Sequence, residues 1–261
     1  IPTLSTVLAA KGYRTAYYYG GDLDFTNVRA YLHATGFARP VGDTDFPVGE
    51  RLSKWGVHDG PVFDRALSDI IGRKDKVPTL TVIQTSSSHE PFEVPFDRFA
   101  QDKRLNAFAY ADDCLGRFVR RLHASGAWDR ALVVIVPDHW GAWPQGLEDR
   151  MRRHHVPLVM TGGALAGTPV VVDKIGSQSA IATTILHLMG IRDALPFGRD
   201  LLDTGTAGFG YVSEPSWFGL VTERGLSVVS TDTGATLQGD SADVHAAKAL
   251  VQSIYTDLSK R

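Results

Sequence analysis

Short runs of Val, Leu and Ile alternate along the chain with segments of helical periodicity, and this alternation most constrains the fold. Predicted strands lie at residues 15–19, 79–85, 131–136 and 156–160. Predicted helices lie between and around them, at residues 4–10, 25–32, 62–71, 105–122 and 181–189. Strands that alternate with helices are typical of βαβ units, in which helices cover both faces of a sheet. The sequence therefore predicts an α/β fold.

The pattern changes beyond about residue 205. The β-like runs 217–222 and 226–230 surround Gly225 and predict an antiparallel hairpin, and an amphipathic helix is predicted at 242–258. No internal repeat or low-complexity linker divides the chain. We therefore expect residues 1–261 to form a single domain, with a small β subregion at 205–235.

Charge and cysteine content exclude several classes of protein. The 261 residues include 27 Lys and Arg against 29 Asp and Glu, a formal charge of −2, and the pI is about 6.5. This balance argues against a nucleic-acid partner, which a basic surface would indicate. The single cysteine, Cys114, excludes an internal disulfide and a thiolate zinc site.

Polar clusters follow three of the predicted strands, where ligands bind in open α/β sheets. They are residues 19–22, residues 86–90 with His89, and Pro137-Asp138-His139; a fourth, His154-His155, precedes a strand. A carboxylate next to an imidazole is a suitable metal-binding pair, so Asp138 and His139 are candidate ligands. Alternatives stay open: an Asp-His dipeptide is common, a loop histidine can cap a turn, and a histidine in a basic stretch can be solvated.

Several longer segments carry a resemblance to a known family. They are residues 19–27, 54–59, 85–92, 126–141, 155–158, 162–165, 176–178 and 185–191. In this order they resemble the sulfatase-like, lipoteichoic acid synthase-like (phosphoglycerol transferase-type) domains of the alkaline phosphatase superfamily. The resemblance implies a three-layer α/β/α fold with a mixed, mostly parallel sheet and a small C-terminal antiparallel sheet.

The resemblance also implies an activity. In such proteins a divalent metal activates a Thr or Ser nucleophile, which displaces an alcohol from a phosphodiester and passes the phosphoryl group on. We expect one metal ion, manganese in first place, with zinc, magnesium or calcium as alternatives. The expected partners are a phospholipid-type donor and a glycan or alcohol acceptor. The expected location is the periplasmic or extracellular face of the cell inner membrane, reached through N-terminal helices.

Site residues follow from the resemblance position by position. Asp138 and His139 would bind the metal, His89 and His155 would be catalytic, and Asp22 and Asn27 would border the head group. The chain departs from lipoteichoic acid synthases at three positions, where Tyr19, Thr26 and Val28 replace a histidine, a tryptophan and an arginine. Ala180 stands where many Gram-negative relatives have an acidic residue.

The family's nucleophile lies upstream of the segment that matches residues 2–5. The resemblance therefore implies that this chain lacks the nucleophile and is inactive alone. Two alternatives stay open beside a phosphotransferase: a sulfatase or phosphodiesterase that transfers to water, and a degenerate, metal-free binding domain. The Cys/Ser-x-Pro/Ala-x-Arg motif that a sulfatase needs for its formylglycine does not occur in this sequence.

Overall fold

The structure is a computed structural model that describes residues 2–141, 143, 145–165, 167–192 and 195–260. The chain divides into two compact units. The N-terminal unit consists of Ser5–Ile135 and Leu158–Gly167, and the C-terminal unit consists of Ile1–Leu4, Val136–Pro157 and Thr168–Arg261. The expected single domain therefore stays a prediction.

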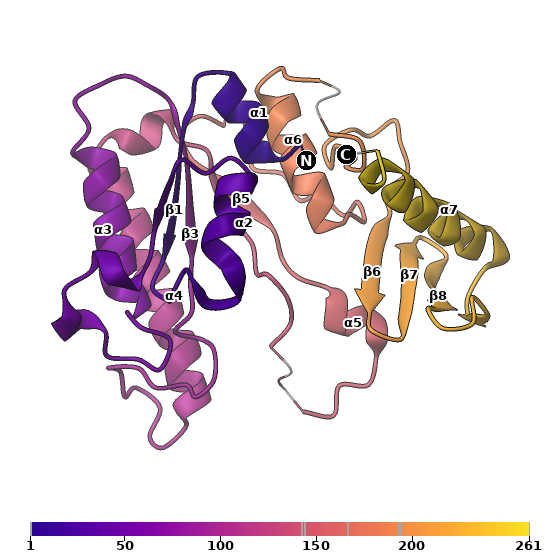
Figure 1. Cartoon of the computed structure of the whole chain (residues 1–261), viewed down its shortest axis with the longest axis horizontal. Coiled ribbons are helices and arrows are strands. Elements are labelled where there is room, and N and C mark those ends of the chain that lie inside the picture. Colours follow the sequence, from indigo (N-terminus) through magenta and orange to yellow (C-terminus); the bar gives the residue numbers. More distant parts are fainter. Residues whose placement is uncertain (1, 142, 144, 166, 193–194, 261) are drawn as a thin grey trace. The chain divides into compact units, whose positions relative to one another are not determined.

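The N-terminal unit is built on a parallel sheet of strand order β2-β1-β3. Its strands are β2 (Arg39–Val41), β1 (Arg14–Tyr19) and β3 (Thr79–Gln84), of which β1 and β3 are labelled in Figure 1. Tyr18 pairs with Val41 on one side and with Ile83 on the other, so β1 is central. Because the strands are parallel, their carboxyl ends share one edge, from which the predicted polar clusters at 19–22 and 86–90 extend.

Helices cover both faces of this sheet, because neighbouring residues of β1 point to opposite sides. On one face Tyr18 packs with Val62 and Ala66 of α3 (Asp59–Ile71), and α4 (Lys103–Ala124) packs against α3. On the other face Tyr17 and Tyr19 pack against a cluster that includes Leu32 of α2 (Val28–Ala34). The predicted three-layer α/β/α arrangement is therefore present, with α1 (Leu4–Ala10) leading into β1.

Two further strands of the N-terminal unit pair with each other. β4 (Val133–Ile135) and β5 (Val159–Thr161) form an antiparallel pair, whereas the sequence predicted a longer, buried strand at 131–136. The residues of β4 are half-buried. Along the chain, residues 136–157 of the C-terminal unit, which carry Asp138, His139 and His155, lie between these two strands.

The C-terminal unit contains the small antiparallel sheet expected near the end of the chain. Its strand order is β6-β7-β8-β9, from β6 (Gly210–Glu214), β7 (Trp217–Thr222), β8 (Gly225–Ser230) and β9 (Thr236–Gln238). Helix α7 (Ser241–Leu258) lies along this sheet (Figure 1). Its Val244 and Ala247 pack on Leu220 and Val229. Helices α5 (Arg150–His154) and α6 (Gln178–Leu188) complete this unit.

Short 3-10 turns lie at Phe25–Asn27, Asp43–Asp45, Val48–Glu50 and Ala127–Arg130. Within the described ranges, no helix combines the length and the apolar character that crossing a bilayer requires.

Candidate functional site

The loop after β3 is tied to the start of α3 by a buried carboxylate. Asp59 accepts hydrogen bonds from the backbone N–H of Ser86 at 2.8 Å and of Ser87 at 3.2 Å, and the Ser87 hydroxyl accepts from the Asp59 N–H at 2.9 Å. Asp59 is 2% exposed. Burial raises the pKa of the Asp59 carboxyl, although the hydrogen bonds from Ser86 and Ser87 act in the opposite direction.

His89 lies on the exposed part of the same loop, and its imidazole has a defined orientation. Its Nδ1 lies 3.0 Å from the carbonyl oxygen of Glu90, and the indole N–H of Trp55 donates to the same oxygen at 2.6 Å. The rings of Trp55 and His89 meet edge to face, with centroids 4.9 Å apart. Since a carbonyl only accepts, Nδ1 carries the proton and Nε2 is the nitrogen left to exchange a proton with a ligand.

The segment that contains Asp22 and Asn27 reaches this group through an aromatic contact. Phe25, which is 59% exposed, stands edge to face on Trp55 with centroids 6.4 Å apart. Thr26 and Asn27 adopt left-handed backbone conformations, with φ of 52° and 62°. Asp22 and Asn27 are exposed, and Asp22 accepts from the Asp24 N–H at 2.8 Å. Strained, exposed backbone beside a candidate catalytic histidine is typical of functional sites.

Two glycines let the Trp55 turn approach the end of β1. A Cβ on Gly20 would lie 2.1 Å from the carbonyl oxygen of Val57, and Gly56 has φ of +120°. The Val57 N–H donates to the Gly20 carbonyl at 2.8 Å. The turn that carries Trp55 therefore rests directly on backbone, which a side chain at either glycine would prevent.

In the C-terminal unit, the structure brings Asp138 and His139 together. Their side chains are 82% and 71% exposed, and His139 Nε2 lies 3.4 Å from Asp138 Oδ2. His139 Nδ1 lies 2.8 Å from the Trp140 carbonyl oxygen, so Nδ1 carries the proton and Nε2 presents its lone pair beside the carboxylate. Metal-binding histidines are commonly oriented by such a bond from the other ring nitrogen.

Helix α6 holds the backbone that carries this pair. The Gln178 side-chain amide donates to the carbonyl oxygens of Pro137 and Asp138 at 2.9 and 2.7 Å. Ser177 precedes the helix and accepts a hydrogen bond from the Tyr211 N–H, which joins the start of α6 to β6. The pair therefore sits on a turn whose backbone is bound by the Gln178 side chain of another element.

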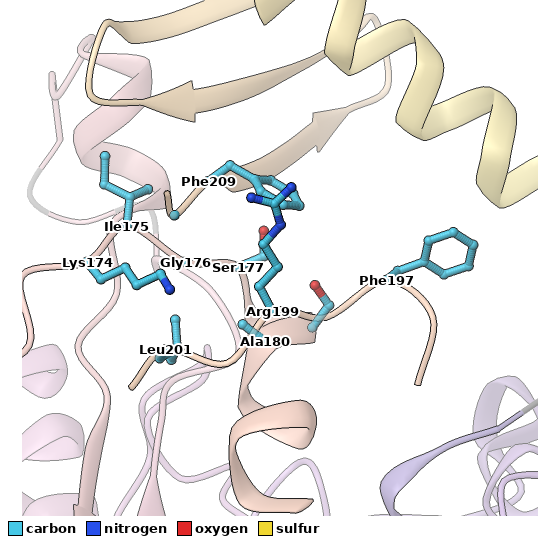
Figure 2. Close-up of a pocket in the computed structure, with 11 residues that line it drawn as sticks. Lys174, Ile175, Gly176, Ser177, Ala180, Phe197, Arg199, Leu201 and Phe209 are labelled. Atoms are coloured by element: carbon cyan, nitrogen blue, oxygen red, sulfur yellow. The ribbon is translucent and has the colours of Figure 1, made fainter. Parts of the chain in front are cut away.

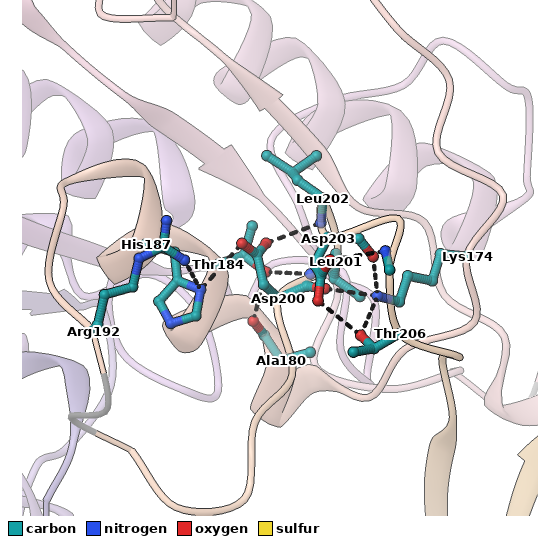
Figure 3. A network of polar contacts seen from close by, with 11 residues as sticks. Lys174, Ala180, Thr184, His187, Arg192, Asp200, Leu201, Leu202, Asp203 and Thr206 are labelled. Carbon is teal, nitrogen blue, oxygen red and sulfur yellow. Dashed lines mark hydrogen bonds and ion pairs between the residues drawn. The ribbon is translucent and has the colours of Figure 1, made fainter.

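A polar network in turn fixes α6 (Figure 3). Thr184 donates to the Ala180 carbonyl at 2.8 Å and accepts from the Leu201 N–H at 2.9 Å. Lys174 donates to the carbonyl oxygens of Asp200 and Asp203 at 2.9 and 2.5 Å. The cavity beside this network measures about 10 Å³, room for about one water molecule, and Ala180 lines it (Figure 2). This cavity is too small for a substrate.

His155 and its neighbour His154 have different surroundings. His154 packs edge to face on Trp217 and lies 3.4 Å from Glu214 Oε1. His155 is exposed at the end of α5, and among the described residues no side-chain hydrogen bond or ion pair joins it to Asp138 or His139. The structure thus brings Asp138 and His139 together but gives His155 no partner in that pair.

The donors at Asp138 and His139 fit two positions around a divalent cation, a carboxylate oxygen and a neutral imidazole nitrogen. Across the part of the chain that the structure describes, no group of three or more His, Cys, Asp or Glu side chains lies close enough to hold a metal ion. A metal bound here would take its remaining ligands from elsewhere.

Sequence reasoning assigned no role to three residues that shape these sites: Trp55, Asp59 and Gln178. Trp55 and Asp59 lie in the matched segment 54–59, and Gln178 lies in the matched segment 176–178. Their position in these matched segments is the sequence signal that could have identified them.

Comparison with known proteins extends the resemblance. A family model described as Sulfatase matches residues 1–191. Lipoteichoic acid synthase 2 of Bacillus subtilis (strain 168) is 24% identical over 229 residues, which are 77% of this chain and 35% of that protein. The chain spans about a third of the length of the curated relatives it matches.

Two solved structures share the fold. A protein of the alkaline phosphatase superfamily from Vibrio parahaemolyticus has a TM-score of 0.82 at 23% identity, covering 98% of this chain and 68% of that one. The lipoteichoic acid synthase LtaP from Listeria monocytogenes has a TM-score of 0.78 at 22% identity, covering 99% and 72%. The predicted α/β fold class, with its parallel sheet and small antiparallel sheet, is confirmed.

Proposed function

The chain belongs to the sulfatase family, and from this premise we propose that it acts as a metal-dependent phosphotransferase outside the cytoplasm. The proposed reaction moves phosphoglycerol or phosphoethanolamine from a phospholipid-type donor to a glycan or alcohol acceptor of the cell envelope. The observation that carries the proposal is the pair formed by Asp138 and His139 Nε2, 3.4 Å apart on a turn held by Gln178. The similarity to lipoteichoic acid synthases supports the donor and acceptor classes.

Asp138 and His139 are the proposed ligands, and manganese is the proposed metal. The superfamily is generally metal-dependent, and both donors suit a divalent cation. A metal held there supplies positive charge that lowers the pKa of a hydroxyl nucleophile and neutralises the transferring phosphoryl oxygens. The protein's own contribution is to present a carboxylate and an imidazole lone pair together.

His89 is the proposed proton-transfer residue. Its Nδ1 is hydrogen-bonded to the Glu90 carbonyl oxygen. Its Nε2 is therefore the nitrogen that exchanges a proton with the leaving or attacking oxygen. Asp22 and Asn27 are proposed to border the head group, since they lie on the exposed segment that Phe25 connects to Trp55. His155 stays a catalytic candidate on its match to the family's sequence alone.

The experiment that tests the proposal follows phospholipid cleavage by the whole encoded protein. Vesicles of phosphatidylglycerol or phosphatidylethanolamine are incubated with the protein, manganese and an oligosaccharide acceptor, and diacylglycerol release is measured with the phosphorus content of the acceptor. We expect diacylglycerol and phosphorylated acceptor in equal amounts. Diacylglycerol with free glycerophosphate would indicate a hydrolase, sulfate release from aryl sulfates would indicate a sulfatase, and no turnover with any donor would contradict an enzymatic role.

A further inference from the structure

The start of α3 and the loop that carries His89 are joined by a reciprocal set of hydrogen bonds. Asp59 Oδ1 accepts from Ser86 and Ser87, and Asp59 Oδ2 lies 3.3 Å from the Ser87 nitrogen. The Asp59 N–H is bound in return by the Ser87 hydroxyl. These residues are 27 and 28 positions apart in the chain, so the contact is tertiary.

The position of Asp59 makes this use of its carboxylate unusual. Asp59 is the first residue of α3, where a carboxylate commonly interacts with the free N–H groups of its own helix. Here it is directed to the amides of another element instead. Those amides lead directly to His89, because the His89 N–H donates to the Ser86 carbonyl at 3.1 Å. The Asp59 carboxylate thus binds Ser86, the residue whose carbonyl accepts the hydrogen bond from His89.

The surroundings of Asp59 give its charge little other support. Among the described residues no ion pair involves Asp59, and the titratable groups around it are His58, Tyr110 and Cys114, with Arg117 donating to the Cys114 sulfur. Burial lowers the pKa of His58, although the Asp59 charge acts in the opposite direction. The amides of the loop are therefore the main groups that stabilise the buried carboxylate, and its place is determined by them.

We propose that Asp59 is a positioning residue, which holds the backbone of Ser86 and Ser87 and thereby sets the place of His89. Asp59 acts through the loop and does not itself touch the substrate. This inference rests on the proposed function for its effect on turnover, but the hold on the loop can be measured without any activity.

The test compares Asp59→Ala with Asp69→Ala. Asp69 lies on the same helix and accepts from Tyr18 and Arg65, but it does not contact the loop. Deuterium exchange of peptides that cover residues 86–92 is measured by mass spectrometry, together with kcat and KM for phospholipid cleavage. We expect Asp59→Ala to accelerate exchange in this loop and to lower kcat by about 10- to 100-fold, with KM changed by less than about threefold. Asp69→Ala should leave both the exchange and the kcat unchanged.

Two conservative variants keep the test decisive if Asp59→Ala does not fold. Asp59→Asn retains one oxygen that can accept from both amides, so we expect it to keep most of the loop's protection and most of kcat. Ser87→Ala removes the reciprocal bond alone and should loosen the loop less than Asp59→Ala. Exchange at residues 86–92 that is unchanged in Asp59→Ala, or in Ser87→Ala if Asp59→Ala does not fold, would overturn the inference. If the natural protein shows no turnover, the proposed function fails, and the exchange result still decides whether Asp59 holds the loop.

Discussion

His89 and His139 share one feature at the scale of single residues. Each follows a predicted strand, and each has Nδ1 beside the carbonyl oxygen of the next residue, at 3.0 and 2.8 Å. This local bond sets the tautomer and leaves Nε2 as the reactive nitrogen in both. Their neighbours differ: an indole packs on His89, whereas a carboxylate lies beside His139. The same local geometry therefore suits proton transfer in one case and metal binding in the other.

We predict that replacing His89 affects turnover and leaves folding nearly unchanged. His89 is exposed, so His89→Ala should lower kcat by about 10²- to 10⁴-fold, the usual contribution of a general acid or base. The melting temperature should move by no more than that of His33→Ala, a change at an exposed histidine of α2. A kcat within a few-fold of the natural protein's would show that His89 is not involved.

We predict that Asp138→Ala reduces the amount of manganese that co-purifies with the protein. The variant removes the carboxylate and leaves His139 as a single donor, and metal affinity depends on the number of ligands. Glu214→Ala is the matched control. Glu214 also lies 3.4 Å from a histidine of the same unit, but that histidine, His154, packs on Trp217. Metal content is measured by elemental analysis. Equal stoichiometry in Asp138→Ala and the natural protein would remove Asp138 from the ligand set.

At the scale of elements, sequence patterns predicted those that carry their own periodic signal. The bounds of α1 agree with the prediction, and β3, β7 and β8 agree within one residue. The sequence did not predict β2, whose three residues include Pro40, nor α5, which is a basic stretch without an apolar face. Such short elements form because tertiary contacts hold them, which no local pattern reports.

In the candidate site, too, some features have a local sequence signal and others depend on tertiary contacts. Asp138, His139 and His89 were predicted because they lie in polar clusters that follow predicted strands, and the family resemblance gave them their roles. The Asp138 carbonyl is bound by Gln178, 40 residues away, and the Ser86 and Ser87 amides that precede His89 are bound by Asp59, 27 and 28 residues away. The matched segments 54–59 and 176–178 contain Asp59 and Gln178, but no local pattern shows which distant residues their side chains contact.

We predict that a contact between two elements makes stability depend on acidity. Asp243 of α7 is buried and accepts from Thr222 at 2.7 Å and from Arg224 at 3.1 Å, and the Arg224 hydrogen bond lowers its pKa below the ordinary value of 3.8. A lowered pKa in the folded state stabilises the protein fully above pH 3.8, and this contribution is lost as the pH falls through the lowered value. Melting temperatures between pH 7 and 2.5 should therefore fall less steeply for Asp243→Asn than for the natural protein.

Asp232→Asn serves as the control for this prediction, because Asp232 is exposed in the turn between β8 and β9. Its profile should follow that of the natural protein. Asp59 has the opposite effect on the pH dependence of stability. Because its pKa is raised in the folded state, its ionisation lowers stability as the pH rises above the ordinary pKa of 3.8. Identical profiles for Asp243→Asn and the natural protein would show that the contact does not depend on the carboxylate's charge.

At the scale of the whole molecule, the chain passes more than once between the two compact units. Residues 136–157 leave the N-terminal unit after β4 and return to it before β5, so the β4–β5 pair closes a loop that belongs to the C-terminal unit. Each unit nevertheless has an apolar core of its own, with Leu67 in one and Leu220 in the other. Separate cores allow independent unfolding, whereas repeated chain crossings favour a single cooperative transition.

We predict one transition, as expected for a single domain. Leu67 and Leu220 are 1% and 5% exposed, so Leu67→Ala and Leu220→Ala should each lower the free energy of unfolding by about 2–5 kcal/mol. The exposed residues Ile71 and Leu237 supply controls. Replacing either by Ala should change the free energy of unfolding by less than about 0.5 kcal/mol. Urea unfolding followed by circular dichroism and by tryptophan fluorescence should give coincident curves, and both core variants should shift that one midpoint. Two separate transitions, with each core variant shifting a different one, would show instead that the units unfold as independent domains and that the β4–β5 connection does not couple them.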